Sequence, residues 1–280
     1  MQKYLFLLFF IGCGPLVLAQ TASNPSFQEA ENKLQDLIQE KKCVGLAAGI
    51  FQGKAVLWKA AAGYQEAESQ TTFTTQTLSR IASITKPMTA IAIMQLFEQG
   101  KIDLNAPIQT YLPDFPQKPQ GSITIQQLLG HSSGMDAYAS RKEINNQKNY
   151  VDLQAALEHI QDRDLVAVPG NEFHYTSYGY VVLGRIIEKV SGMNYETYLK
   201  KNIWEPAGME NTSLEKYGQA VAHKSLIYHK DKKGKIRKEA FTNLSDRVPG
   251  GGVQSTLEDL LTFGKAVLTN QLVKAETLER

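Results

Sequence analysis

The sequence predicts an α+β fold in which strands and helices occupy separate stretches of one domain. Two apolar runs near the start, VGLAAGIF and AVLWKAAAGY, flank Gln52-Gly53-Lys54 and predict a two-stranded hairpin. The middle of the chain carries helical patterns without strands between them, which argues against alternating βαβ units. With 42% hydrophobic residues among 280, the chain can bury a substantial core.

Two helices are predicted on either side of this hairpin. Apolar residues recur at helical spacing from Phe27 to Ile38, which predicts an amphipathic helix over 26–41. Residues 83–99 are apolar almost all round, and Gly100 is a suitable C-terminal stop, so a buried helix is expected there. The first helix therefore has one packing face, whereas other elements enclose the second.

The central part of the chain is predicted to be a long loop followed by helices. Four prolines between residues 103 and 120 indicate a structured loop. Short helices are expected at 124–130 and 152–161, and a longer one from Ser177 to Val190, closed by Gly192.

The last part of the chain predicts a hairpin and a helix. Residues 223–242 are basic, with a turn expected at Lys233-Gly234, and their lysines indicate an exposed, solvated ribbon rather than a polyanion site. A glycine run, residues 250–252, then precedes a predicted helix over 256–269.

Residues 1–19 have the pattern of a secretory signal peptide. Lys3 precedes a long apolar run, and Val17-Leu18-Ala19 is a suitable cleavage site. We therefore expect secretion or export to the periplasm, with no stable membrane span once the segment is removed. Lipid attachment at Cys13 is a second hypothesis, disfavoured because the residues after Cys13 continue the apolar run.

Charge and composition exclude several classes of partner and cofactor. Lys and Arg total 30 against 28 Asp and Glu, so we expect no nucleic-acid or membrane-surface partner. No cofactor or metal site is expected, because His223 and His229 lie in the basic ribbon without carboxylates or cysteines at ligand spacing. Cys43, the only cysteine after signal cleavage, is interpreted as buried filler.

One serine lies in a motif typical of another enzyme class. Gly130-His131-Ser132-Ser133-Gly134 fits the G-x-S-x-G nucleophile elbow of α/β-hydrolases, which requires a strand before the serine and a helix after it. Thr124 and Gln127 instead form a capping box, which predicts a helix before the serine. Ser132 is therefore interpreted as a polar residue at a helix end, and an α/β-hydrolase using Ser132 is retained as a disfavoured hypothesis.

A second serine has a lysine at catalytic spacing. Ser83 and Lys86 are three residues apart at the start of the predicted buried helix, so both side chains lie on one face. A neutral lysine can take the proton of a serine hydroxyl, and burial next to a helix N-terminus disfavours the charged ammonium. The backbone N–H of Ser83 could also donate to a developing oxyanion. The alternative interpretation is an N-cap serine followed by a lysine that extends to solvent.

The same tetrapeptide pattern occurs at a second place and serves as a control. Ser213-Leu214-Glu215-Lys216 also matches S-x-x-K, but Tyr217 and Gly218 follow it instead of a buried helix. Nothing in the sequence would keep Lys216 dry, so Ser213 is not expected to be a nucleophile.

Several longer stretches resemble the class C β-lactamase and D-alanyl-D-alanine peptidase family. The segments RIASITKPMTA, KIDLNAPIQTYLPDFP and ITIQQLLGHSSGM resemble it in consistent order, followed by FHYTSYGYVVLGRIIEKVSGMNYETYLKKNIWEPAGM and VPGGGVQSTLEDLLTFGKAVL. The resemblance runs from about Val44 to Leu268. The IYHKDKKGKIRK ribbon and the Tyr-Thr-Ser motif are most similar to the mitochondrial β-lactamase-like serine protease branch.

The resemblance implies a fold and its division along the chain. We expect a penicillin-binding transpeptidase-like antiparallel sheet flanked by helices, together with a mainly helical subdomain. A single domain over 20–280 would contain the N-terminal helix and first strands at 20–80. The helical subdomain would follow at 81–215, and the basic hairpin and glycine-led helix at 216–280.

The resemblance also implies roles for individual residues of a serine hydrolase acting on amide, lactam or ester bonds. Ser83 would be the nucleophile, Lys86 the adjacent base, and Tyr175 would share proton transfer with Lys86. Ser177 stands where the family's Tyr-x-Asn motif has Asn and would contact substrate or lysine through a hydroxyl. The alternative interpretation of Tyr175 is a buried aromatic residue before a helix.

The family's third motif is absent from this sequence. That motif is a Lys- or His-Thr-Gly on a strand well after STLEDLLTFG, and it supplies a second oxyanion donor, but neither tripeptide occurs here. A sheet made only of strands near 44–63 would also have an uncovered edge and a half-exposed face. We therefore expect a truncated gene product or fragment. A non-catalytic protein that retains the pocket without turnover is the alternative function.

Overall fold

The computed structural model describes residues 7–9, 27–240 and 242–280 of the chain. In this part of the chain the strands form three antiparallel sheets, ordered β1-β2-β3-β4, β5-β9-β6 and β7-β8. The strands are β1 (Leu7–Phe9), β2 (Gly45–Gln52), β3 (Ala55–Glu66), β4 (Thr71–Thr72), β5 (Ser79–Arg80), β6 (Ser213–Leu214), β7 (Tyr228–Lys230), β8 (Ile236–Lys238) and β9 (Val253–Ser255).

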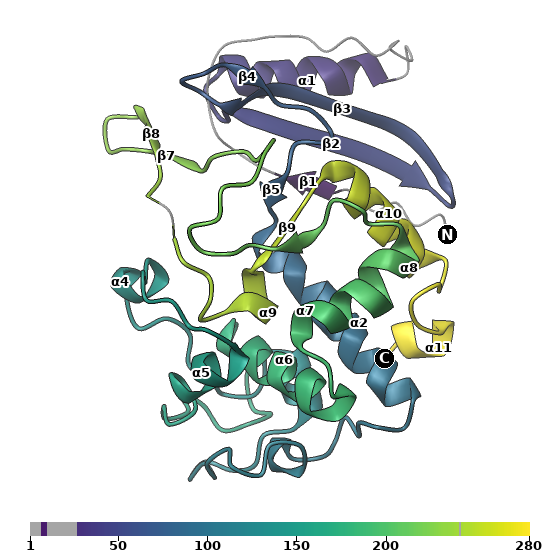
Figure 1. Cartoon of the computed structure of the whole chain (residues 1–280), viewed down its shortest axis with the longest axis vertical. Coiled ribbons are helices and arrows are strands. Elements are labelled where there is room, and N and C mark those ends of the chain that lie inside the picture. Colours follow the sequence, from purple (N-terminus) through teal and green to yellow (C-terminus); the bar gives the residue numbers. More distant parts are fainter. Residues whose placement is uncertain (1–6, 10–26, 241) are drawn as a thin grey trace.

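The helices lie on both sides of the first sheet and gather in a helical region beside it (Figure 1). They are α1 (Gln28–Gln39), α2 (Thr85–Glu98), α3 (Ile125–Leu129), α4 (Arg141–Ile144), α5 (Leu153–Glu158), α6 (Tyr178–Ser191), α7 (Tyr195–Leu199), α8 (Glu205–Ala207), α9 (Val248–Gly251), α10 (Leu257–Leu268) and α11 (Ala275–Leu278). No helix in the described ranges combines the length and apolar character that a membrane crossing requires. The mixture of helices and antiparallel sheets confirms the predicted α+β class.

The predicted hairpin is present, and both of its faces are covered near its base. Side chains alternate between the faces of a strand, so Leu46 and Ala48 of β2 pack against α1, whereas Ala47 and Phe51 pack against α10. Figure 1 shows these helices on opposite sides of the sheet. The expected half-exposed face is therefore wrong for this part of the sheet, because α10 returns to it from the far end of the sequence. The hairpin tip is open, where Val56 is 49% exposed.

The outer edges of the β2–β3 hairpin are also paired over part of their length. β4 pairs with β3, and β1 pairs with β2. β1 falls inside the predicted signal peptide, whose cleavage stays a prediction. The rest of that segment, Cys13 included, lies outside the described residues.

The buried helix predicted at 83–99 forms the centre of the helical region. A 3-10 turn, Ala82–Ile84, leads into α2, whose Met88, Ala92 and Ile93 are fully buried. α2 packs against α6 and α9, which lie far away in the sequence. Gly100, with φ +68°, follows α2 in the left-handed conformation that glycine adopts readily.

The glycine run forms an element that periodicity did not indicate. Val248–Gly251 is the short helix α9, and β9 follows it and pairs with both β5 and β6. A three-residue strand has too few positions to show alternation, so only its partners define it. The predicted helix after the glycines is confirmed as α10, and the basic hairpin as β7 and β8 with a turn at Gly234.

Candidate active site

Four segments meet at the N-terminal end of α2. Ser83 lies in the turn before α2, and Lys86 lies in the first turn of α2 itself. Tyr175 and Ser177 belong to the segment that leads into α6, and Gly250 lies in α9. The structure therefore brings together all four of the residues predicted for the site, and it adds α9.

Ser83 receives hydrogen bonds from two of these residues. The Tyr175 hydroxyl donates to Ser83 Oγ at 2.7 Å, and Lys86 Nζ lies 3.3 Å from the same atom. The Ser83 residue is exposed, so a carbonyl group in solution can reach it. Ala82, directly before it, has φ +46°, an uncommon conformation for a residue other than glycine.

Lys86 is buried, and its amine contacts three oxygen atoms. Nζ lies 2.7 Å from the carbonyl oxygen of Gly250, 3.1 Å from Ser177 Oγ and 3.3 Å from Ser83 Oγ. Only 5% of the residue is exposed. This burial lowers the pKa of Lys86 below that of an ordinary lysine, and the neighbouring Tyr175 hydroxyl acts in the opposite direction.

The partners of Lys86 also orient its neutral form. A neutral amine keeps two N–H groups and gains one lone pair, and the Gly250 carbonyl can only accept. One N–H therefore stays on Gly250, and the second can stay on Ser177 Oγ. The lone pair is then left for the Ser83 hydroxyl, which is the geometry that proton abstraction requires.

Ser177 faces the lysine in this structure. Its residue is 7% exposed, and its Oγ is the acceptor at 3.1 Å from Lys86. Of the two contacts expected for this hydroxyl, the one to lysine is present, and the one to substrate stays a prediction.

Tyr175 is half-exposed beside the amine. The residue is 45% exposed, so its interpretation as a buried aromatic is wrong. Lys86 Nζ lies 4.7 Å from the centre of its ring, and its hydroxyl points at Ser83. The exposed ring and the bonded hydroxyl place Tyr175 where it could contact both a substrate and the nucleophile.

Three contributors to the site were missed by sequence reasoning. Gly250 was noted only as part of a glycine run, yet its approach to α6 requires the absence of a side chain, because a Cβ there would lie 2.8 Å from Ser177 Cβ. Thr89 Oγ1 donates to the Pro249 carbonyl at 2.8 Å and holds α9 against α2. His131 packs on the Tyr175 ring with 4.4 Å between ring centres. The glycine run pointed to Gly250 and the G-H-S-S-G motif to His131. Neither pattern indicates which residue of the site its member contacts.

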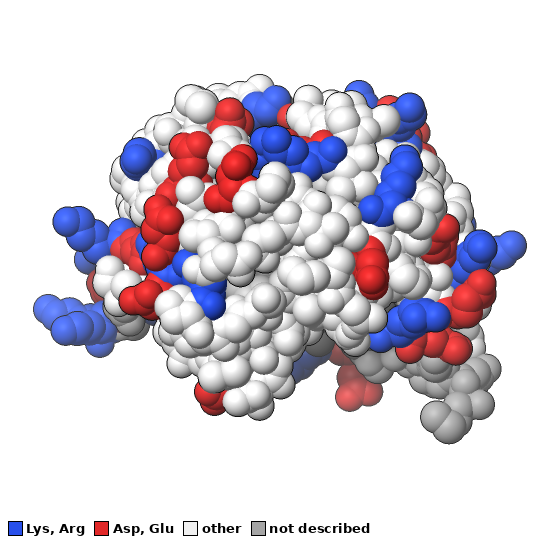
Figure 2. All heavy atoms as spheres, turned by 90° about the horizontal axis from the view of Figure 1, so that it is seen from below, with Lys and Arg blue, Asp and Glu red and all other residues white. Residues whose placement is uncertain are grey.

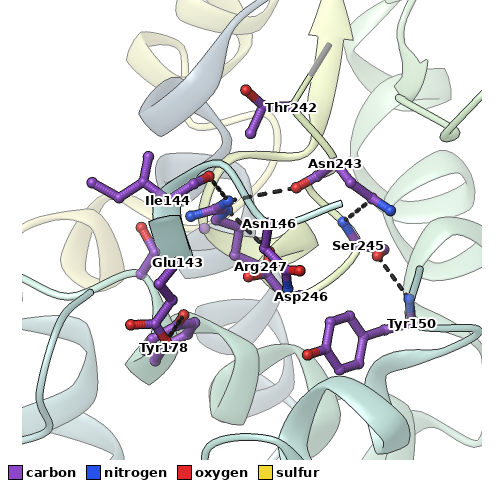
Figure 3. A network of polar contacts seen from close by, with 12 residues as sticks. Glu143, Ile144, Asn146, Tyr150, Tyr178, Thr242, Asn243, Ser245, Asp246 and Arg247 are labelled. Carbon is purple, nitrogen blue, oxygen red and sulfur yellow. Dashed lines mark hydrogen bonds and ion pairs between the residues drawn. The ribbon is translucent and has the colours of Figure 1, made fainter. Parts of the chain in front are cut away.

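A buried polar network anchors the start of α9 (Figure 3). Arg247 Nε lies 3.0 Å from Asp246 Oδ1, and both side chains are almost fully buried. A second guanidinium nitrogen of Arg247 donates to the carbonyl of Ile144, and the Ser245 hydroxyl accepts from the N–H of Tyr150 at 2.8 Å. Burial raises the pKa of Asp246 to about 6, opposed by the charge of Arg247. This network ties α9 to α4 and to Tyr150.

Ser132 and Ser213, the two other serines in catalytic-type motifs, lie in surroundings unlike those of Ser83. The residues before Ser132 form α3 with the predicted Thr124–Gln127 capping box, so no strand leads into a nucleophile elbow. Ser213 starts the short strand β6, and Lys216 is exposed and paired with Glu196 at 3.3 Å. Neither serine has the buried amine that Ser83 has.

A cavity of about 1260 Å³ extends from Ser83 along α2 and α10. Most of its lining is apolar and includes Ile84, Met94, Phe263 and Val267. On the described part of the face seen in Figure 2, acidic and basic side chains are interspersed around uncharged areas. In the described ranges no group of three or more His, Cys, Asp or Glu side chains could hold a metal ion.

This chain is similar in sequence and in fold to several known proteins. The Beta-lactamase family model matches residues 30–280. The human serine beta-lactamase-like protein LACTB, mitochondrial, is 27% identical over 313 residues, covering 86% of this chain and 57% of the relative. The octameric penicillin-binding protein homologue from Pyrococcus abyssi is 30% identical with a TM-score of 0.78, covering 90% of this chain and 58% of that one. The penicillin binding protein from Bacillus halodurans is 27% identical with a TM-score of 0.72, covering 83% and 73%. The chain thus spans little more than half the length of the LACTB and Pyrococcus relatives.

Proposed function

This chain belongs to the β-lactamase family, and we infer from that premise that it is a serine hydrolase working through an acyl-enzyme on Ser83. The family and the penicillin-binding-like fold expected from sequence are both confirmed by the comparisons. One observation carries the proposal: the exposed Ser83 hydroxyl lies within hydrogen-bond reach of both a buried lysine amine and a tyrosine hydroxyl. A base beside the nucleophile, with a second group that moves protons, is the arrangement that acyl transfer needs.

The proposed reaction has two halves. Ser83 Oγ attacks the carbonyl carbon of an amide, lactam or ester while its proton passes to the neutral amine of Lys86. The departing nitrogen or oxygen takes a proton through Tyr175, which leaves Ser83 acylated. Water then attacks the ester, gives its proton to the same pair of side chains, and releases the acid and the serine hydroxyl.

The tetrahedral intermediate needs a donor for its oxyanion. The first N–H groups of a helical segment have no partner within it, so the Ser83 N–H, in the turn leading into α2, is available. Removing one oxyanion donor from a hydrolase costs about 10²–10³ in rate.

The proposed substrates are small molecules or peptides with an activated or strained carbonyl. Amides, lactams and esters all have a planar acyl carbon that carries a nitrogen or oxygen leaving group, so the Ser83 hydroxyl can attack each of them in the same way. Export to the periplasm or the outside of the cell, as the N-terminal residues predict, would give access to extracellular peptides and lactams.

Intact-mass spectrometry tests the nucleophile. The full chain is incubated with benzylpenicillin or with p-nitrophenyl acetate, and we expect one acyl adduct on the wild type and none on Ser83→Ala. The chain offers two matched controls: Ser132→Ala, from the G-x-S-x-G motif, and Ser213→Ala, from the second S-x-x-K. Both should be acylated like the wild type. An adduct that persists on Ser83→Ala would reject the proposal.

A non-catalytic protein is the second candidate, and one observation favours it. Neither Lys-Thr-Gly nor His-Thr-Gly occurs in this sequence, so the family's usual second oxyanion strand has no counterpart by motif. This candidate requires no steady-state turnover of chromogenic β-lactams, D-alanyl peptides or short acyl esters. Turnover that disappears in Ser83→Ala would exclude it.

A further inference from the structure

We infer that His131 is the positioning residue that holds Tyr175 against Ser83, an assignment that rests on the function proposed above. His131 belongs to the G-H-S-S-G segment, whose serine is not in the site. The segment thus would serve the reaction through its histidine, which contacts Tyr175 and reaches no reacting atom.

The first step of the argument is that His131 binds the backbone on both sides of Tyr175. Its carbonyl accepts the N–H of His174 at 2.7 Å, and its ring Nδ1 accepts the N–H of Thr176 at 3.3 Å. The His131 backbone has φ +55°, in the left-handed region that few residues other than glycine adopt. Both acceptors of His131 therefore bind the same segment, residues 174–176.

The second step is the packing of the rings. The His131 ring lies 4.4 Å from the Tyr175 ring and 5.2 Å from the Tyr180 ring, measured between centres. The Tyr180 hydroxyl donates to the Leu129 carbonyl at 3.1 Å, so this second neighbour of the histidine ring is itself held in place. His131 is 9% exposed and Tyr175 is 45% exposed. The histidine is therefore a rigid support for a ring that is otherwise half in solvent.

The third step is the charge of the histidine. Nδ1 accepts a hydrogen bond, so the neutral ring carries its proton on Nε2. Burial lowers the pKa of His131 to about 4, and the nearby charge of Lys86 acts in the same direction. The support is accordingly neutral at pH 7, and it adds no second cation beside the amine that must lose its proton.

Two variants separate the ring from the acceptor. His131→Asn keeps an acceptor oxygen near the position of Nδ1 and tolerates a positive φ, but it removes the ring. His131→Phe keeps a ring and removes the acceptor. Both are made in the full chain, alone and combined with Tyr175→Phe, and the single-turnover rate constant of acylation by p-nitrophenyl acetate is measured. Each rate constant is divided by the folded fraction, which is measured by circular dichroism under the same conditions, so that partial unfolding does not obscure it.

We expect each His131 variant to slow acylation about tenfold to a hundredfold when Tyr175 is present, because a displacement near 1 Å has that cost. In the Tyr175→Phe background the same changes should alter the rate constant by no more than about twofold. His159→Asn is the matched control, since His159 also packs on a tyrosine, with 5.1 Å between ring centres, and lies outside the site. It should acylate at the wild-type rate.

The outcomes distinguish the two proposals. If the wild type shows no acylation on Ser83, the proposed function fails. If the wild type is acylated and the His131 variants slow the reaction by the same factor in both backgrounds, only the role of His131 is rejected. Variants that acylate at the wild-type rate reject it as well.

Discussion

Lys86 Nζ lies 2.7 Å from the carbonyl oxygen of Gly250, although the two residues are 164 positions apart in the chain. The contact joins the first turn of α2, next to the proposed nucleophile Ser83, to α9. Because a carbonyl accepts and cannot donate, it holds one N–H of the amine in every protonation state. The position of α9 therefore decides where the remaining donors and the lone pair of Lys86 point.

Gly250→Ala should lower the acylation rate about tenfold or more, because its Cβ would lie 2.8 Å from Ser177 Cβ and would move α9 away from the amine. Gly251→Ala is the matched control, since the nearest atom to its Cβ is 3.7 Å away, an ordinary contact. Single-turnover acylation by p-nitrophenyl acetate measures both. Equal rates for the two variants would contradict the role assigned to the carbonyl of Gly250.

Lys86→Arg should abolish most of the activity while keeping a positive charge. A guanidinium does not give up its proton in proteins, so it cannot act as the base, and loss of general base catalysis costs about 10²–10⁴ in rate. Lys216→Arg, in the second S-x-x-K, changes an exposed residue and should have no effect. Acylation of Lys86→Arg at a rate near wild type would remove Lys86 from the mechanism.

Acylation should speed up as pH rises and level off below pH 10.5, the ordinary value for lysine. The sign follows from burial, which lowers the pKa of Lys86, and from the need for an unprotonated base. The rate constant is measured across pH after subtraction of the uncatalysed reaction. A rate still rising steeply at pH 10.5 would mean that burial does not perturb the amine.

His131 should make the protein less stable in acid. Its pKa is about 4 in the folded protein and 6.5 in the ordinary state, so the unfolded chain binds the proton first as pH falls. The stability linked to neutral His131 is complete above pH 6.5 and is lost as pH falls toward 4. Urea unfolding of the wild type and of His131→Asn at several pH values isolates this effect, because other titrating groups such as Asp246 cancel in the difference. A pH-independent difference would contradict it.

Arg247→Leu should lower the free energy of unfolding by about 3–5 kcal/mol, the cost of leaving a buried charge without its partner. Asp246, which is 1% exposed, would then have no cation beside it. The double variant Arg247→Leu with Asp246→Asn should recover part of the loss, because the buried carboxylate is gone. Urea denaturation at pH 7 measures the free energy of unfolding of the wild type and of both variants. A double variant no more stable than Arg247→Leu alone would show that the charge is not the source of the cost.

Local sequence patterns predicted most of the elements around the site. The helices α1, α2, α6 and α10 follow the periodicity and stop signals of their own residues, and the β2–β3 hairpin follows its turn. The pairing of Ser83 with Lys86 was also predictable, because both residues lie within one turn. Two of the elements that were missed, α9 and β9, are too short to carry a period and exist through contacts with α2, β5 and β6.

The sequence by itself determined the family and the fold class, because ordered motifs along most of the chain carry them. It also determined the pairing of Ser83 with Lys86, because the two residues lie within one turn. Only the tertiary structure decided what surrounds the amine. Its dry environment and its acceptors come from α9 and from the segment before α6, and the support of Tyr175 comes from His131. Desolvation depends on every atom within a few ångströms, and those atoms come from parts of the sequence that no local pattern connects.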